Sequence, residues 1–258
     1  AKQFNALIEL IKSAHDEGGY YPIEKRILIE KGVSASALST LEKKGILIAE
    51  RLQIDRIHLN KGTLSNFKEL TAAQSEALAG LKTSMNENKV TLLHGVTGSG
   101  KTELYVQLIQ DQLDLGKQVL FLLPEIALTT QLIQRLSAYF GEKIGVYHSK
   151  FNQNERVEIW NKVLNDDQHE FRIILGARSS VFLPFQNLGL IIVDEEHEGS
   201  FKQYDPSPRY NGRDAAIVLG RMHEAKVILG TATPSLETFT NAKQGKFGLV
   251  NLKERYKG

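Results

Sequence analysis

The sequence has no cysteine, which excludes disulfide bonds and thiolate metal sites within its 258 residues. It has no apolar run of about eighteen residues or more, so it predicts no transmembrane helix, and its start lacks the pattern of a signal peptide. A strong excess of charge is missing too: the net charge is +2 at pH 7, so binding to a polyanion must rely on a local patch. Together these absences favour a cytoplasmic protein with no membrane contact.

The remaining composition is that of a globular protein, with 41% hydrophobic and 24% charged residues. A chain of this length can bury one sizeable core, or a large core with a small domain attached. Because it begins at Ala1 and ends at Gly258 without a capping element, we expect a piece of a longer protein.

Residues 1–60 predict a winged-helix domain, followed by a linker over 61–68. Apolar residues recur at helical spacing near the start, Ser34 is suited to cap a later helix, and Gly45 is suited to end it. Whether this domain touches DNA stays open, because acidic residues are scattered among its basic ones. The expected helices cover 4–14, 23–30 and 35–44, and the expected strands cover 46–48 and 57–59.

Residues 69–258 alternate between apolar strand candidates and helical stretches. Strands that are apolar throughout and separated by helices are typical of a parallel sheet covered on both faces, so this part predicts an α/β fold. The expected strands cover 90–94, 119–123, 144–148, 171–175, 188–193, 226–229 and 247–252, and the expected helices 103–115, 129–140, 155–165, 213–224 and 235–244.

Residues 95–102 match the G-x-x-x-x-G-K-[ST] pattern of a phosphate-binding loop. Lys101 brings a positive charge to the β- and γ-phosphates of ATP, and the Thr102 hydroxyl can ligate Mg²⁺. An apolar strand before the loop and an amphipathic helix after it supply the context that a chance glycine-rich turn lacks. The predicted nucleotide site comprises Gly95, Val96, Thr97, Gly98, Ser99, Gly100, Lys101 and Thr102.

An acidic motif, Asp194-Glu195-Glu196-His197, follows a buried-strand pattern directly. A carboxylate at the tip of a parallel strand lies at the sheet edge where the phosphate loop also lies. Asp194 is therefore suited to hold Mg²⁺ through its water shell, and Glu195 to orient or deprotonate the attacking water. The alternative is an acidic loop that only solvates a strand end. His197 has an alternative too, a hydrogen bond to a neighbouring loop.

Several strings together resemble the PriA family of replication-restart helicases, which belong to superfamily 2. These are the phosphate loop, the acidic motif, and the segments 123–129, 176–184 and 229–235. The resemblance implies a RecA-like lobe from about residue 69 to the end, driven by ATP and Mg²⁺. It implies that Gln74 reads adenine and that His197 couples the nucleotide state to the DNA-side loops. It also implies a second lobe with a cysteine-rich zinc module, which these residues do not contain.

The segment 199–213 interleaves aromatic and basic residues in a Pro- and Gly-rich stretch, a composition suited to base stacking and phosphate contact. The alternative places the aromatics in the core beneath the loop. The resemblance adds Thr129, Arg178 and Ser179 as backbone contacts, although Arg178 could equally be a structural ion-pair partner. The loop's candidate DNA contacts are Phe201, Lys202, Tyr204, Arg209 and Tyr210, with Arg213 as a further basic residue at its end.

The resemblance implies a 3′-to-5′ DNA helicase acting at stalled, branched forks, with single-strand DNA-binding protein and primosome proteins as partners. Two alternatives stay open: another superfamily 2 translocase with a winged helix, and a nucleotide-gated DNA-binding regulator that reads a duplex sequence. Fork preference irrespective of sequence favours the helicase, and preference for one sequence favours the regulator.

Overall fold

The computed structural model describes residues 3–4, 6–10, 28–29, 31–47, 65–124, 127, 130–147, 153–165 and 170–255. The chain forms two compact units, residues 1–54 and 55–258, and each is taken by itself. Among the described residues, no helix has the length and apolar character needed to cross a membrane.

The N-terminal unit contains the predicted capped helix, α3 (Ala35–Lys43). The Ser34 side chain accepts a hydrogen bond from the Ala37 backbone, as an N-cap should. Residues 46 and 47 of the expected strand 46–48 are not in a strand. The backbone N–H groups of Ile46 and Leu47 both donate to the Leu41 carbonyl and close the end of the helix. The other expected strand lies outside the described residues, so the winged helix stays a prediction. The buried apolar residues of this unit are Ala6, Leu28, Val33, Ala37, Leu38 and Leu41.

The larger unit is built on a seven-stranded sheet in the order β3-β4-β2-β5-β6-β1-β7, with every neighbouring pair parallel. All seven expected strands are present, with bounds shifted by up to two residues. They are β1 (Val90–Gly95), β2 (Gln118–Leu122), β3 (Ile144–Tyr147), β4 (Ile173–Gly176), β5 (Leu188–Asp194), β6 (Lys226–Thr231) and β7 (Gly248–Leu252).

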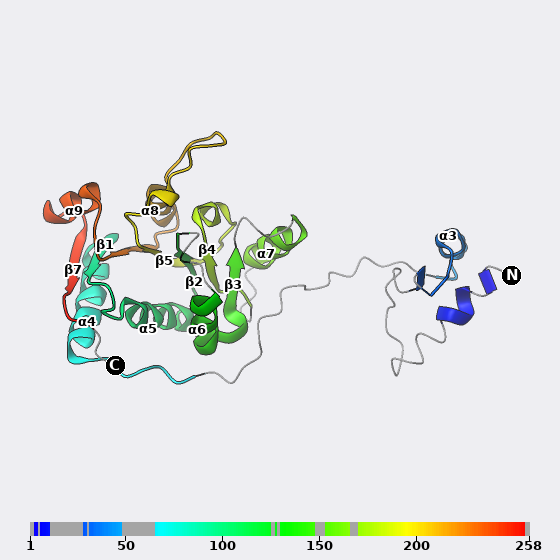
Figure 1. Ribbon diagram of the computed structural model, residues 1–258, viewed down its shortest axis with the longest axis horizontal. Helices are drawn as coiled ribbons and strands as arrows, with labels where there is room; N and C mark the ends of the chain where they lie inside the picture. The colour runs from blue at the N-terminus through cyan, green and yellow to red at the C-terminus, as the bar shows by residue number, and fades with distance from the viewer. Residues whose placement is uncertain are drawn as a thin grey trace. The chain divides into compact units, whose positions relative to one another are not determined.

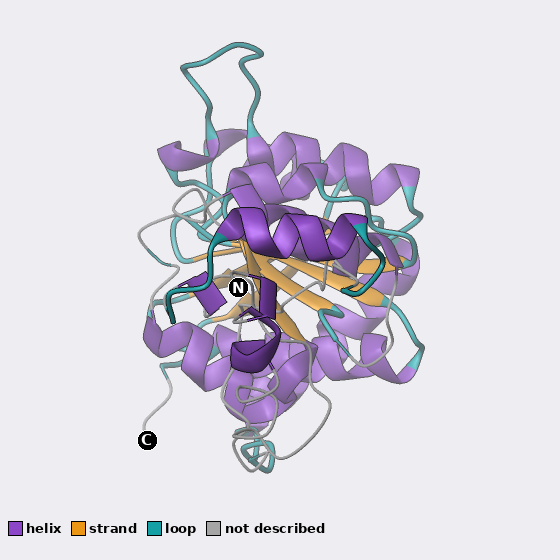
Figure 2. Ribbon diagram, turned by 90° about the vertical axis from the view of Figure 1, so that its right-hand side faces the viewer, coloured by secondary structure: helices purple, strands orange, loops and turns teal. Residues whose placement is uncertain are grey.

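Helices cover both faces of this sheet, and the strands lie between them (Figure 1, Figure 2). One buried apolar cluster joins α4, α5 and α6 to one face, and a second joins α7, α8 and α9 to the other. This arrangement confirms the predicted α/β fold. The helices are α4 (Ala72–Glu87), α5 (Lys101–Asp114), α6 (Thr130–Phe140), α7 (Gln153–Asn165), α8 (Gly212–Met222) and α9 (Leu236–Lys243), with short 3₁₀ turns η1 (Gly141–Lys143), η2 (Arg178–Phe182) and η3 (Gly199–Phe201).

Helix α4 and the residues before it were not anticipated. Thr71 caps α4 in a capping box with Gln74, in which each side chain accepts from the other's backbone N–H. Phe67, in the predicted linker, packs against Tyr139 and Phe140 with ring centroids 5.6 and 6.2 Å away. Ser65 and Phe67 therefore contact α6, and the linker over 61–68 stays a prediction because 61–64 lie outside the described residues.

Candidate functional site

The phosphate loop lies between the carboxyl end of β1 and the start of α5. Gly98 and Gly100 have φ of 74° and 82°, a left-handed backbone that favours glycine. The Lys101 Nζ atom donates to the Gly95 carbonyl over 3.0 Å, so the side chain folds back across the loop. The Ser99 Oγ atom is buried and has no hydrogen-bond partner among the described residues. These features fit a loop shaped to hold a phosphate anion.

Gln74 contacts this loop directly. It is 1% exposed, and its Nε2 atom donates to the Ser99 carbonyl over 3.0 Å. Its Oε1 atom accepts from the Thr71 backbone over 3.0 Å. The described geometry therefore shows Gln74 supporting the shape of the phosphate loop, whereas its contact with adenine stays a prediction.

Asp194 ends strand β5 at the edge of the sheet where the phosphate loop lies, and Glu195 follows it directly. The Lys101 Nζ atom is 3.7 Å from Glu195 Oε1, which brings the predicted phosphate ligand and the predicted base together. Burial, and then the charge of Glu195, raise the pKa of Asp194 to about 6. Glu195 has φ of 49°, a left-handed conformation that costs a non-glycine residue energy and that often marks a functional position.

Tyr105 is a site residue that the sequence did not reveal. It belongs to α5, is fully buried, and donates from its hydroxyl to Asp194 Oδ1 over 2.9 Å. Burial, and then the charge of Asp194, hold the pKa of Tyr105 well above its usual value, so the hydroxyl remains a donor. The signal available in the sequence was its position one helical turn after Lys101, on the helix that the loop begins.

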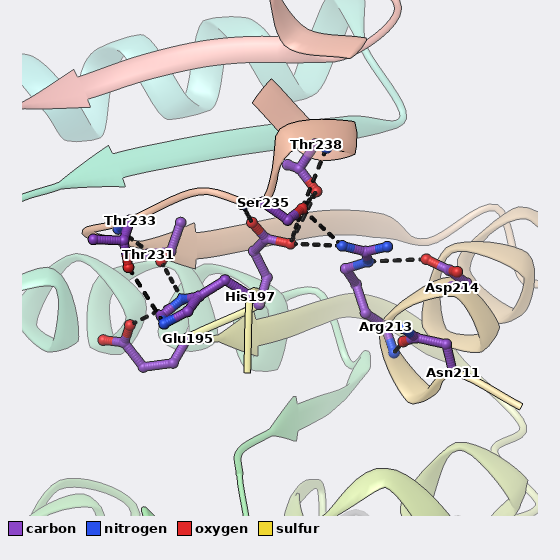
Figure 3. Close-up of polar contacts among 10 residues, drawn as sticks. Glu195, His197, Asn211, Arg213, Asp214, Thr231, Thr233, Ser235 and Thr238 are labelled. Carbon is purple, nitrogen blue, oxygen red and sulfur yellow. Dashed lines mark hydrogen bonds and ion pairs between the residues drawn. The ribbon is translucent and has the colours of Figure 1, made fainter. Parts of the chain in front are cut away.

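His197 connects the acidic motif to the segment after β6. Its Nδ1 atom lies 2.8 Å from Thr231 Oγ1, and its Nε2 atom 3.3 Å from Thr233 Oγ1. Its Nδ1 atom is also 3.7 Å from Glu195 Oε2 (Figure 3). His197 thus contacts both the predicted catalytic base and the threonines of segment 229–235, so it does more than bond one neighbouring loop.

The aromatic loop, which is the part of segment 199–213 between η3 and α8, projects from the lobe (Figure 1, yellow). An antiparallel bridge between Lys202 and Asn211 closes its base. Tyr204 is 63% exposed, with Lys202 Nζ 5.1 Å from its ring centroid, and Arg209 is exposed as well. These three residues are presented to solvent, as stacking and phosphate contact require.

Phe201 is a correction to the predicted DNA contacts. It is 1% exposed and belongs to the apolar cluster beneath α8, so it presents no ring face to a base. Tyr210 is half-buried and packs edge-to-face on Phe182 at 5.0 Å. Phe182 is 57% exposed and was not anticipated as a contact, although it lies within segment 176–184. Phe182 is therefore exposed at this surface, as Tyr204 is, whereas Phe201 is not.

Arg178 supports the aromatic loop from below. Its Nη1 atom donates to the carbonyls of Ser200 and Lys202 over 3.0 and 3.4 Å. These partners are carbonyls and not the carboxylate of an ion pair, and the contact of Arg178 with the DNA backbone stays a prediction. Ser179 is half-buried in η2, and Thr129 lies outside the described residues.

The parallel sheet, the phosphate loop and the acidic motif define a RecA-like motor lobe. The DEAD/DEAH box helicase family matches residues 71–242, and the chain belongs to this family. Membership implies ATP and a divalent cation as ligands, and the loop and carboxylates described above fit both.

Relatives in this family carry the name replication restart protein PriA, which confirms the predicted resemblance. The chain is 43% identical over 240 residues to the protein of Chlamydia muridarum, covering 91% of the chain. It is 40% identical over 229 residues to that of Bacillus subtilis and 48% identical over 190 residues to that of Rickettsia conorii, covering 86% and 73% of the chain. The chain spans only 31%, 28% and 28% of these three relatives.

Solved structures share the fold. RecG bound to a three-way DNA junction aligns with a TM-score of 0.53 at 22% identity, over 74% of this chain and 24% of that one. The E. coli DExH-box NTPase HrpB aligns with a TM-score of 0.52 at 16% identity, over 73% of this chain and 22% of that one. At these identities the likeness shows the RecA-like fold alone.

Proposed function

We propose that this chain is the nucleotide-binding lobe of an ATP-dependent 3′-to-5′ DNA helicase that restarts replication at stalled forks. The observation that carries the proposal is the approach of Lys101 Nζ to within 3.7 Å of Glu195 Oε1 beside Asp194. It brings a phosphate-binding cation, a base and a cation-binding carboxylate to one sheet edge. The identity to replication restart proteins supports the choice of DNA as the substrate.

The residues divide the chemistry among them. Lys101 and the loop's backbone N–H groups would hold the phosphate oxygens, and Thr102 with Asp194 would hold Mg²⁺. Glu195 accepts the proton of the attacking water, and His197 transmits the state of the site to Thr231 at the end of β6 and to Thr233 beyond it. Bound Mg·ATP supplies the free energy for movement when its terminal phosphate is cleaved.

On the nucleic-acid side, Tyr204, Tyr210 and Phe182 supply aromatic faces or edges to a single strand. Lys202 and Arg209 supply charge for its phosphates, and Arg178 sets the loop in place. Thr129 and Ser179 stay as predicted backbone contacts. We propose single-stranded DNA and branched forks as the nucleic-acid partners, and single-strand DNA-binding protein and primosome proteins as protein partners in the cytoplasm. A zinc module, if it is cysteine-rich as the resemblance implies, lies outside these residues.

An ATPase assay tests the proposal in the protein that carries this lobe, called the parent protein below. We expect single-stranded and branched DNA to raise the rate of ATP hydrolysis. For each of these two kinds of DNA, substrates of unrelated sequence should raise the rate to similar extents. Stimulation by one duplex sequence only would contradict the helicase and favour the nucleotide-gated regulator. Strand separation assays with substrates tailed at the 3′ or the 5′ end of the translocation strand test the polarity.

A further inference from the structure

The third residue of the acidic motif, Glu196, is a buried carboxylate to which the site described above assigns no role. It is 2% exposed, although it stands between two partly accessible residues. It accepts from the Ser235 backbone over 2.7 Å, from Ser235 Oγ over 3.0 Å, from Thr238 Oγ1 over 2.9 Å and from Arg213 Nη1 over 3.0 Å. Figure 3 shows Arg213, Ser235 and Thr238 converging on one carboxylate.

The side chains that donate to Glu196 belong to helix α8 and to helix α9 with its N-cap, which lie apart in the sequence. Arg213 lies in the first turn of α8, where the aromatic loop returns to the lobe. Ser235 is the N-cap of α9 and follows the segment that contacts His197. Glu196 itself is flanked by Glu195 and His197. One carboxylate thus joins the end of the aromatic loop, the segment after β6 and the catalytic motif.

The polar atoms of the Arg213 side chain form several hydrogen bonds within the protein. Its side chain is 12% exposed, and its Nη1 atom also donates to Ser235 Oγ over 2.8 Å. Its Nε atom donates to Asp214 Oδ1 over 2.9 Å. From the sequence, Arg213 is a basic residue at the end of the candidate DNA-binding loop, but its polar contacts are with residues of the protein itself. A buried carboxylate requires such a partner, because an unpaired charge there is strongly unfavourable.

We propose that Glu196 and Arg213 form a positioning pair that transmits the position of the aromatic loop to Glu195 and His197; this inference rests on the proposed function. The loop is held at its start by Arg178, through the Ser200 and Lys202 carbonyls, and at its end by Arg213. Movement of the loop on a DNA strand therefore moves Arg213.

Glu196 follows Arg213 because separating the buried charges is costly. Glu195, its chain neighbour, already holds a φ of 49°, so a small displacement of Glu196 changes the direction in which the Glu195 carboxylate points. We assign the pair no contact with the nucleotide or with DNA. Its effect is on the ratio between hydrolysis with and without DNA.

The test compares Arg213→Gln, Glu196→Gln and the double substitution in the parent protein. Measurements are the melting temperature, the Kd for Mg·ADP, the Kd for an oligothymidylate strand, and ATP turnover without and with saturating oligothymidylate. We expect each single variant to lose about 3- to 30-fold of the DNA stimulation while both Kd values change by less than about twofold. The double variant should lose much less than the product of the single losses, because both act through one contact.

Two further variants keep the test decisive where an unpaired charge prevents folding. Thr238→Val removes one hydroxyl from the same carboxylate and leaves the ion pair, and Arg213→Lys retains the charge. Both should lower the stimulation ratio, whereas Arg221→Gln, at an exposed position of α8, should not. Lower melting temperatures with an unchanged ratio would mean a static brace and would overturn the proposal. A wild-type protein that DNA does not stimulate would overturn the proposed function and this pair together.

Discussion

The carboxylate of Asp194 is held by a hydrogen bond from the Tyr105 hydroxyl. The fully buried Tyr105 donates from its Oη atom to Asp194 over 2.9 Å, and this bond stabilises the ionised carboxylate. A carboxylate that is to hold a divalent cation must be ionised, while its burial works in the opposite direction. Tyr105 therefore belongs to the site even though it touches no ligand.

Tyr105→Phe should weaken the use of the cation with little change in packing. A hydrogen bond to a charged group contributes about 1.5–3 kcal/mol, so we expect the Mg²⁺ concentration for half-maximal turnover to rise by about tenfold or more. A Mg²⁺ titration of ATP turnover in the parent protein measures this. Tyr139→Phe, in the same apolar cluster, is the matched control. An unchanged Mg²⁺ dependence would show that the bond has no part in cation binding.

Glu195 is the residue at which binding and chemistry should separate. Glu195→Gln retains the shape of the side chain but cannot accept a proton, so we expect the parent protein to keep its Mg·ATP affinity within about threefold and to lose turnover by about 10²–10⁴-fold. Calorimetry and a coupled ATPase assay give the two quantities. Glu198→Gln, just beyond the motif, is the control. Turnover near that of the wild type would remove Glu195 from the role of base.

At the scale of elements, the aromatic side chains in and beside the aromatic loop differ in burial, and this difference predicts which of them affect DNA binding and which affect stability. Tyr204→Ala removes an exposed ring, and we expect it to weaken oligothymidylate binding by about 1–3 kcal/mol with an unchanged melting temperature. Phe182→Ala should behave in the same way to a smaller extent, because part of the ring packs on Tyr210. Fluorescence anisotropy measures the DNA affinity of both variants, and thermal melting measures their stability.

Phe201→Ala provides the contrast, because it empties a buried position. We expect a loss of about 3–5 kcal/mol in the free energy of unfolding, with DNA affinity reduced only as far as folding is reduced. If Phe201→Ala weakened DNA binding without a loss of stability, the assignment of its ring to the core would be wrong.

The element scale also shows what the sequence could reveal. The strands were predictable because each is a short and mostly apolar run, and β5 led directly to the acidic motif. Helix α4 was not, because its alanine, serine and glutamine residues form a weak apolar stripe, and only Thr71 with Gln74 marked its start. The composition of the aromatic loop predicted contact with DNA, but it did not predict which rings face solvent. That difference depends on which surface lies beneath Phe201.

At the scale of the whole molecule, the lobe presents one side of a nucleotide site. Related motors close the site with a second lobe, whose arginine stabilises the charge of the transition state and contributes about 10³–10⁵ in rate in other NTPases. The chain spans 28–31% of the relatives described above. We therefore expect this chain alone to bind Mg·ADP weakly and to hydrolyse ATP at a rate near background, with or without DNA. Robust DNA-stimulated turnover of residues 1–258 would show that the catalytic set is complete within them.

Strand β6 lies between β1 and β5, so the phosphate loop and the acidic motif are separated by a strand that belongs to neither. Tyr105 reaches Asp194 only by crossing that strand, and it crosses at Gly230, where a Cβ atom would collide with the tyrosine hydroxyl. Gly230 is thus needed for the room it leaves and not for its backbone freedom. A single methyl group placed there would displace the Tyr105 hydroxyl from Asp194, and so disturb the acidic motif although none of its own residues had been altered.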